Sequence, residues 1–356
     1  MKKVNEKNYL YSRVVRIWLM IGLVMLIGQV ILGGITRLTG SGLSITKWEI
    51  VTGTIPPLSQ KAWDDAFGLY KETPQFQQIN SNFDLDDFKY IYFWEYFHRL
   101  WARTLGFVFL LPFLYFLFSK KIDRFLIKRL TVVILFTAIT ASAGWIMVQS
   151  GLVDRPWVNA YKLTLHLILA VLTITAMVWT IADANLLGGL KCRCRNLVRT
   201  LLFITFLQLI VAGLMAGMKA GLYYSTWPDM NGTFIPEVLL DPNNWSWHNL
   251  TNYDSYLFAP ALVQFLHRIL AYILLMLTYY LFFSYRNQMA GTQKSWLNWS
   301  FVLINLQVLL GIATLFFIQD AAIPVFFGVA HQLVGLLYYI SILFLFFGLR
   351  TPQLTK

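Results

Sequence analysis

Four histidines lie inside apolar stretches of the sequence, where an imidazole without a hydrogen-bonding partner is costly. They are His98, His166, His267 and His331, whereas a fifth, His248, lies in the polar segment "NNWSWHNLTNYD" and is expected to be solvated. Imidazole nitrogens are frequent ligands of transition metals, and two imidazoles can bind one iron from opposite sides. Histidines within a membrane usually face the protein interior with a partner. The four apolar-segment histidines are therefore the first candidates for chemistry.

The segments that carry these histidines are long and apolar enough to cross a membrane. Hydrophobic residues make up 57% of the 356 positions, aromatic residues 17% and charged residues only 13%. A bilayer core of about 30 Å requires about 20 apolar residues in a helix. Eight such stretches are present, at about 15–37, 93–118, 128–150, 158–183, 198–218, 257–284, 296–318 and 323–348. The sequence thus predicts an all-α integral membrane protein with eight transmembrane helices.

The distribution of positive charge predicts the orientation of these spans. If the N-terminus is inside, 18 of the 29 Lys and Arg residues fall on the inner side, together with only Glu6, Asp123 and Asp183 of the 17 acidic residues. Lys and Arg resist transfer across the membrane. Both termini are therefore expected to be cytoplasmic, and the net charge of +12 reflects membrane orientation and does not indicate nucleic-acid binding.

The N-terminus is a short basic tail without the features of a mitochondrial transit peptide, so a bacterial inner membrane is the simplest location. Cys192 and Cys194 fall on the predicted inner side, where thiols are normally reduced. Two free thiols without a function are the expectation there, although a metal or redox role for the C-x-C pair is the alternative.

An internal repeat divides the chain into two similar parts. The segment "GGITRLTGSGLSITKWEIVTGTIPP" (33–57) matches "AGLMAGMKAGLYYSTWPDMNGTFIP" (212–236) at seven of 25 positions without gaps. Each segment is followed by a span that opens with a related phrase, "EYFHR" and then "QFLHR". Two four-helix halves, 1–188 and 189–356, are predicted, and parallel repeats of this kind pack around a pseudo-two-fold axis along the membrane normal.

Each half carries two of the four histidines, on its second and fourth spans and in the outer half of the bilayer. Two imidazoles from different helices of one four-helix unit can hold b-type haem, so two haem sites are predicted. A structural zinc site would need four converging ligands, and copper lacks a Met or Cys companion at similar spacing. For any single histidine, a hydrogen bond to a neighbouring helix is the alternative.

The repeats differ next to the first histidine of each half. Glu95 lies one helical turn before His98, whereas the residue before His267 at the same spacing is Gln264. A carboxylate can take a proton and an amide cannot. The difference suggests that one half keeps a permanent haem and the other performs chemistry, unless Glu95 only supports His98 or pairs with Arg99.

Arg99 and Arg268 directly follow the first histidine of their halves and lie toward the outside. A guanidinium pairs well with a carboxylate, so both arginines are candidates for binding haem propionates. Snorkelling to the membrane interface is the competing explanation.

The combination of these motifs resembles the haem A synthases, membrane enzymes of bacteria and mitochondria. The resemblance is carried by "GGITRLTGSGLSITKWEIVTGTIPP", "EYFHR", the histidine of the fourth span, "TWPDMNGTFIP", "FLHR" and the "AHQ" at 330–332. It implies oxidation of the C8 methyl group of haem O, through a hydroxymethyl stage, to the formyl group of haem A. It further implies that His98 and His166 are axial ligands of the substrate haem, that His267 and His331 bind a haem b cofactor, and that Glu95 is catalytic.

The resemblance also implies partners, namely a haem O synthase as supplier, the assembly of cytochrome c oxidase as destination and an electron acceptor that the sequence does not identify. Residues 38–92 contain no cysteine, as in the branch of the family that lacks a cysteine pair in the first outer loop. This acidic loop could cap the substrate or dock a partner. Two other classes stay open, a di-haem electron carrier related to quinol oxidoreductases and a haem transporter.

Overall fold

The computed structural model describes residues 10–47, 52–153, 155–185, 192–318 and 323–349, and this part of the chain is helical apart from one isolated β-bridge. Eight of its helices are long and apolar enough to cross a membrane, as predicted: α1 (Arg13–Leu38), α4 (Leu85–Phe118), α5 (Arg124–Leu152), α6 (Ala160–Ala184), α7 (Arg195–Gly217), α10 (Phe258–Tyr285), α11 (Gly291–Phe316) and α12 (Ile323–Gly348). Six of the basic residues used for orientation, Lys2, Lys3, Lys7, Lys191, Arg350 and Lys356, lie outside the described residues.

Polar caps fix where several spans begin. Ser12, Asp123 and Asn159 each accept a backbone hydrogen bond from the first turn of α1, α5 and α6. α4 begins at Leu85, eight residues before the predicted span, because Asp84 and Asp87 form a reciprocal capping box there. Hydropathy detects only the part of a helix that lies in lipid, so the polar first two turns of α4 were assigned to the loop.

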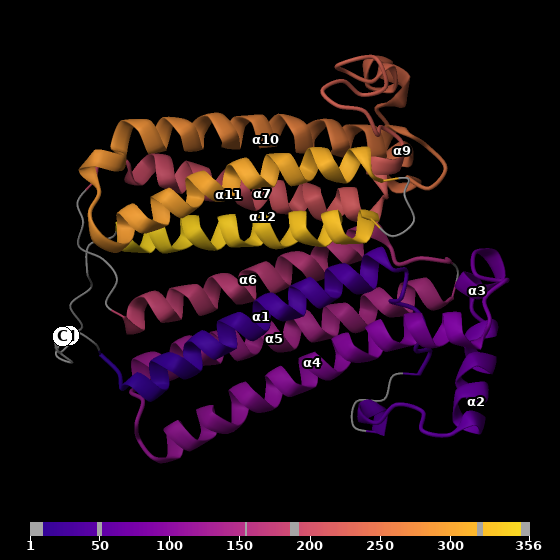
Figure 1. Cartoon of the computed structure of the whole chain (residues 1–356), viewed down its shortest axis with the longest axis horizontal. Coiled ribbons are helices and arrows are strands. Elements are labelled where there is room, and N and C mark those ends of the chain that lie inside the picture. Colours follow the sequence, from indigo (N-terminus) through magenta and orange to yellow (C-terminus); the bar gives the residue numbers. More distant parts are fainter. Residues whose placement is uncertain (1–9, 48–51, 154, 186–191, 319–322, 350–356) are drawn as a thin grey trace.

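The spans form two groups of four (Figure 1). In the N-terminal group α1 packs on α4 and α6, and α5 packs on α6; in the C-terminal group α7 packs on α10 and α12, and α11 packs on α12. Between the groups α6 contacts α7, α1 contacts α12, and α6 contacts α12. We take α7, α10, α11 and α12 as the counterparts of α1, α4, α5 and α6, in that order. If every helix is replaced by its counterpart, each of these contacts corresponds to another contact of the same set, and the α6–α12 contact corresponds to itself. α10 also packs on α11, and among the described residues no comparable packing of α4 on α5 matches it, so the two halves agree in most of their helix contacts but not in all.

The two groups share one apolar core. It contains Trp18 and Leu19 of α1, Phe113 of α4, Ile174 of α6 and Leu343 of α12, all buried. Polar contacts cross the same boundary: Tyr339 lies 2.9 Å from Thr175 between their hydroxyl oxygens, Gln332 Nε2 donates to the Val30 carbonyl (2.7 Å), and Arg37 donates to the Ala216 carbonyl (2.6 Å). The halves are therefore packed as one body.

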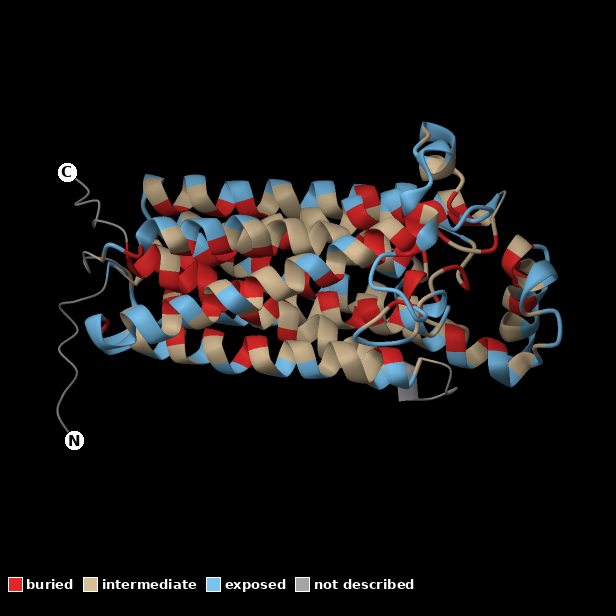
Figure 2. Cartoon of the chain, turned by 90° about the horizontal axis from the view of Figure 1, so that it is seen from above, coloured by how far each residue is buried: buried red, intermediate tan, exposed pale blue. Residues whose placement is uncertain are grey.

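The surface of the bundle is apolar, as expected for helices surrounded by lipid. Figure 2 shows exposed residues along the rim of the bundle and buried ones toward its middle. Large exposed side chains include Phe107 (65%), Leu309 (64%) and Phe283 (70%). Such exposure would be costly in water and is neutral in hydrocarbon.

The longer connections gather at one end of the bundle, which we call the loop end (Figure 1). On the N-terminal side it carries η2 (Thr52–Thr54), α2 (Gln60–Lys71) and α3 (Pro74–Gln78), and on the C-terminal side η3 (Ala220–Leu222), α8 (Glu237–Leu240), η4 (Pro242–Asn244) and α9 (Trp247–Thr251). At the opposite end, η5 (Arg286–Gln288) connects α10 to α11. The sequence predicts that the loop end faces the outside.

The first connection at the loop end is a small folded unit rather than a plain solvated loop. α2, α3 and the start of α4 enclose an aromatic cluster that includes Phe67, Tyr70 and Phe88. Burial raises the pKa of Tyr70 to about 12, and its hydroxyl donates to Gln75 (3.1 Å). Gln75 in turn donates to the Gly40 carbonyl (2.9 Å), which ties the unit to the end of α1.

The expectation of two free thiols at Cys192 and Cys194 is wrong in this structure, where the two sulfurs form a disulfide. The chain turns directly before α7, which brings the two Cα atoms to 5.2 Å, within the range that a disulfide spans.

Candidate functional site

The structure brings His267 of α10 and His331 of α12 together in the C-terminal half. Their ring centroids lie 6.2 Å apart, with the ring planes inclined at 58°. Two metal–nitrogen bonds of about 2 Å, plus about 1.2 Å from each nitrogen to its ring centre, give a centroid separation of about 6.4 Å for a bis-imidazole metal site. The spacing of this pair therefore fits one iron between the rings.

The ring of His331 is held in the tautomer that a metal ligand needs. Its Nδ1 lies 3.1 Å from the backbone carbonyl oxygen of Gln307, and its Nε2 lies 3.1 Å from the Gln307 side-chain nitrogen. Nδ1 therefore donates its hydrogen to the carbonyl while Nε2 is the acceptor. One turn further along α11, a Cβ added at Gly311 would lie 2.9 Å from His331 Cε1. Glycine is thus needed for this close approach.

The same arrangement holds His166 of α6 in the N-terminal half. Its Nδ1 lies 2.9 Å from the Thr140 carbonyl oxygen, and a Cβ at Gly144 would lie 2.8 Å from His166 Cε1. In both halves the carbonyl that accepts the hydrogen bond from Nδ1 belongs to the residue four positions before the glycine on which the ring packs. Nε2 of His166 is consequently left free to bind a metal.

His98 of α4 lies close enough to His166 for the two imidazoles to interact electrostatically. A Cβ at Gly33 of α1 would be 3.4 Å from His98 Nε2, so glycine leaves space beside this nitrogen too. Within the described residues no three His, Cys, Asp or Glu side chains converge on one point. Each half therefore offers two imidazole ligands, which is what a haem iron requires and fewer than structural zinc takes.

Glu95 does not bond to His98 but to the connection that follows α1. Its side chain is buried (2% exposed), and Oε2 accepts from Ser44 N (2.8 Å), Ser44 Oγ (2.8 Å) and Ile45 N (2.9 Å). Oε1 pairs with Arg99 one turn later (2.5 Å). The carboxylate thus fastens residues 44–45 to α4, one turn from His98.

Gln264 has the corresponding role in the C-terminal half. It is fully buried, and its Nε2 donates to the Tyr224 carbonyl (2.6 Å) while Oε1 has no partner. In the ungapped alignment of the repeats Tyr224 is the counterpart of Ile45. Glu95 thus accepts from the backbone N–H of Ile45 in one half. In the other half Gln264 donates to the backbone carbonyl of the equivalent residue, Tyr224.

Arg99 and Arg268 bind equivalent backbone carbonyls. Arg99 donates to Ile45 O (3.2 Å) and Lys47 O (3.3 Å), and Arg268 donates to their counterparts, Tyr224 O (3.2 Å) and Thr226 O (2.8 Å). The first role of both guanidinium groups is to clamp the connection after the first helix of each half. Their predicted contact with haem propionates stays a prediction.

The loop that Arg268 clamps also holds an ionised carboxylate. Hydrogen bonds from the Thr226 hydroxyl (2.5 Å) and the Gly232 backbone N–H (3.2 Å) lower the pKa of Asp229 below its ordinary value. Asp229 is therefore charged at neutral pH, and its backbone carbonyl accepts from Arg268 (2.5 Å).

Two glutamines that the motif analysis missed lie against the first histidine of each half. Gln29 Nε2 donates to the His98 carbonyl (3.3 Å), and Gln208 Nε2 donates to the His267 carbonyl (3.0 Å). Gln29 and Gln208 lie four residues before the starts of the two aligned repeat segments. Extending that alignment by one helical turn would have found the pair.

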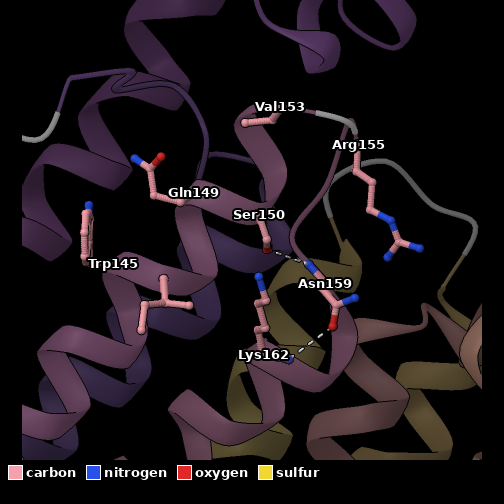
Figure 3. A pocket seen from close by; sticks show the side chains of 8 residues that line it. Trp145, Gln149, Ser150, Val153, Arg155, Asn159 and Lys162 are labelled. Atoms are coloured by element: carbon pink, nitrogen blue, oxygen red, sulfur yellow. Dashed lines mark hydrogen bonds between the residues drawn. The ribbon is translucent and has the colours of Figure 1, made fainter.

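His248 lies on α9, where its side chain is exposed as predicted. A separate cavity of about 490 Å³ lies at the loop end between α5 and α6 (Figure 3). It is lined by Trp145 and Gln149 of α5 and by Asn159 and Lys162 near the start of α6. Lys162 lies one turn from His166, so this cavity opens beside the N-terminal histidine pair.

Comparison with known families decides where the chain belongs. The model of the cytochrome oxidase assembly protein family matches residues 16–343, which include all eight spans at least in part. The chain belongs to this family. All four histidines of the membrane spans, together with Gln29 and Gln208, fall within the matched region.

Curated relatives in this family match over nearly their whole length. A heme A synthase of Nitrosospira multiformis is 36% identical over 352 residues, covering 97% of this chain and 96% of the relative. Heme A synthases of Flavobacterium johnsoniae and Bradyrhizobium diazoefficiens are each 39% identical, covering 94% and 91% of this chain and 95% and 88% of the relatives. No solved structure gave a significant match.

Proposed function

We propose that this chain is a haem A synthase, a membrane oxidoreductase that converts the C8 methyl group of haem O through a hydroxymethyl group to the formyl group of haem A. Each of the two stages removes two electrons from the carbon. Family membership over residues 16–343 supports the reaction class. The observation that carries the proposal is the pair His267 and His331, whose ring centroids lie 6.2 Å apart, as one iron between them requires. The N-terminal half places His166 against a glycine and a carbonyl in the same way as His331.

The two halves hold different haems in this proposal. His98 and His166 are the axial ligands of the substrate haem O, and His267 and His331 are those of a resident haem b. The fit of the second pair rests on its 6.2 Å ring separation and on the carbonyl that orients His331. When bound, haem b would supply one-electron redox chemistry beside the substrate half.

Glu95 is the proposed proton acceptor of the reaction. It is a buried carboxylate one turn from His98, while the corresponding Gln264 cannot titrate. Ser44, Ile45 and Arg99 hold both oxygens, so the group is fixed in place before the substrate arrives. Both two-electron oxidations remove hydrogen from the reacting carbon, and a carboxylate fixed beside the substrate could take up a proton in either of them.

The proposed location is the bacterial inner membrane, with both termini in the cytoplasm and the histidine pairs in the outer half of the bilayer. Basic residues at the end of the bundle opposite the loop end support this orientation. A haem O synthase is the proposed supplier, the cytochrome oxidase that receives haem A is the destination, and the electron acceptor is unidentified. A reporter fused after residue 190 should read cytoplasmic, and one inserted near residue 75 should read periplasmic.

The decisive experiment is extraction of the haems after expression with a source of haem O. A formyl-bearing haem should appear only when this chain is present. A di-haem electron carrier would return unmodified haems from the purified protein, and a haem transporter would change the distribution of haem across the membrane without changing its structure. Either result in place of a formyl haem would contradict the proposal.

A further inference from the structure

The first histidines of the two halves differ in how their rings are held. Gln208 Nε2 lies 3.1 Å from His267 Nδ1 as well as 3.0 Å from the His267 carbonyl oxygen. Its counterpart Gln29 reaches only the carbonyl of His98, at 3.3 Å. Among the described residues no side chain or carbonyl forms a hydrogen bond with the ring of His98. Within the described residues the ring of His267 therefore has a hydrogen-bond partner and the ring of His98 has none.

The side-chain oxygens of Gln208 and Gln29 are both buried without a hydrogen-bond partner among the described residues, so the two glutamines differ in the contact of Gln208 Nε2 with a ring nitrogen. Gln208 Oε1 is buried and has no hydrogen-bond partner, while Nε2 faces a ring nitrogen. A half-turn of the amide exchanges its nitrogen and oxygen, which have nearly the same shape. An imidazole that binds a metal through Nε2 must carry its hydrogen on Nδ1, and that hydrogen needs an acceptor. Gln208 Oε1 can provide it after such a half-turn, which gives up the donation of Nε2 to the His267 carbonyl seen in the structure.

Both histidines of the C-terminal half then have a fixed ring, since His331 Nδ1 already donates to the Gln307 carbonyl. In the N-terminal half only His166 has such a partner, the Thr140 carbonyl. A permanently bound cofactor is held more tightly when both of its ligands have fixed orientations. A site that binds substrate and releases product at every turnover needs one ligand that dissociates readily. The difference matches the division of labour proposed above.

We propose that Gln208 is a positioning residue that fixes the ring of His267 and thereby makes the C-terminal haem resident, while the unheld ring of His98 lets the N-terminal haem exchange. This inference rests on the proposed assignment of the two haems. Because partners that orient a metal-ligating histidine contribute about 10- to 100-fold to metal affinity, the effect should be measurable on the purified protein.

The test compares Gln208→Leu with the matched variant Gln29→Leu. Both changes remove one amide that donates to a histidine carbonyl, but only the first removes the partner of a ring nitrogen. Release of the b-type haem from purified protein to an excess of apomyoglobin should be about 10- to 100-fold faster in Gln208→Leu and unchanged in Gln29→Leu. Release at the wild-type rate in Gln208→Leu, or equal acceleration in both variants, would overturn the inference.

A second variant keeps the test decisive if Gln208→Leu does not fold. Gln208→Glu retains an acceptor for Nδ1–H and adds negative charge, so the haem should be retained and its reduction potential should fall below that of the wild type. An unchanged potential would contradict direct contact with the ring. These readouts do not depend on haem A formation, so a protein that retains haem as described but makes no formyl haem would refute the proposed function and leave the role of Gln208 intact.

Discussion

The N-terminal and C-terminal halves use the same framework to place two imidazoles and differ in the side chains beside them. In both halves the second histidine packs on a glycine and directs Nδ1 to a carbonyl of the preceding helix. The differences are Glu95 against Gln264, and, among the described residues, a ring without a hydrogen-bond partner at His98 against a ring with one at His267. The comparison teaches that the two halves share the arrangement around their second histidine and differ in the side chains beside their first histidine. The proposed distinction between a substrate site and a cofactor site rests on those few side chains.

The largest expected effect is loss of the C-terminal haem. His267→Ala or His331→Ala should abolish the stable b-type absorption of the purified protein, because a bis-imidazole site loses one axial ligand. Optical spectra of the reduced protein measure this directly, and His248→Ala, at an exposed position, is the control that should change nothing. A normal low-spin spectrum in both ligand variants would remove the assignment of haem b to this half.

The next effect separates chemistry from haem binding. Glu95→Gln gives the N-terminal half the residue found in the C-terminal half, and haem A output should fall by about 10² to 10⁴ if Glu95 is the general base. Haem O or its hydroxylated intermediate should accumulate while the C-terminal haem stays at wild-type occupancy. Chromatography of extracted haems gives both quantities.

The structure also defines the control for this variant. An amide at position 95 places an N–H₂ group among the donors Ser44 N, Ile45 N and Arg99, which could loosen the connection without affecting chemistry. Ser44→Ala removes one donor to the same carboxylate and leaves the carboxylate in place. If Ser44→Ala lowers haem A output as much as Glu95→Gln does, Glu95 acts through the connection and not as a base.

A third prediction concerns the glycines that let the second histidine of each half approach its carbonyl. Gly311→Ala should lower occupancy of the C-terminal haem alone, and Gly144→Ala should weaken haem O binding alone, since each new Cβ would meet a histidine ring at less than 3.0 Å. Overpacking of this kind costs about 1–3 kcal/mol. Gly106→Ala on α4, where a Cβ would meet nothing within 4 Å, is the matched control. Equal loss in both halves from either variant would contradict two separate sites.

The smallest predicted effect concerns the clamps that the halves share. Arg268→Lys should lower the free energy of unfolding by about 1–3 kcal/mol, because a lysine cannot reach the several carbonyls of residues 224–229 that the guanidinium binds. Arg99→Lys should have a similar or smaller effect. Thermal denaturation in detergent measures both. A loss of haem without a loss of stability would instead favour a role in binding propionates.

The eight spans could be predicted from the sequence because they depend on hydropathy. The pairing of histidines within each half stays a prediction, which the ring separation of His267 and His331 supports. The sequence could not predict that α4 begins at Leu85, since the polar turns of a helix outside the membrane have no hydropathy signal. The carbonyl acceptors at Thr140 and Gln307 were also hidden, because a backbone atom acts there and any residue type provides one. The pair Gln29 and Gln208 was visible in the repeat but lay outside the aligned motif.

The polarity of "EYFHR" has two explanations that the structure separates. Arg99 clamps residues 45–47, as Arg268 clamps their counterparts. His98 has no such structural explanation, because its ring is unbonded among the described residues. Glu95 has a structural role and is also a candidate for chemistry. It holds Ser44 and Ile45 through hydrogen bonds, and it is the only carboxylate within "EYFHR".

The exchange of contacts between the halves has an evolutionary consequence. α6 meets α7 in the same way that α12 meets α1, and α6 meets α12 at the centre. Two copies of a single four-helix chain could make these contacts with each other, and the present chain carries two such halves joined in one polypeptide. Joining removes the requirement that both copies be identical. One copy could then acquire a glutamate at position 95 and the other keep an amide, a division of duties that no symmetric homodimer can encode.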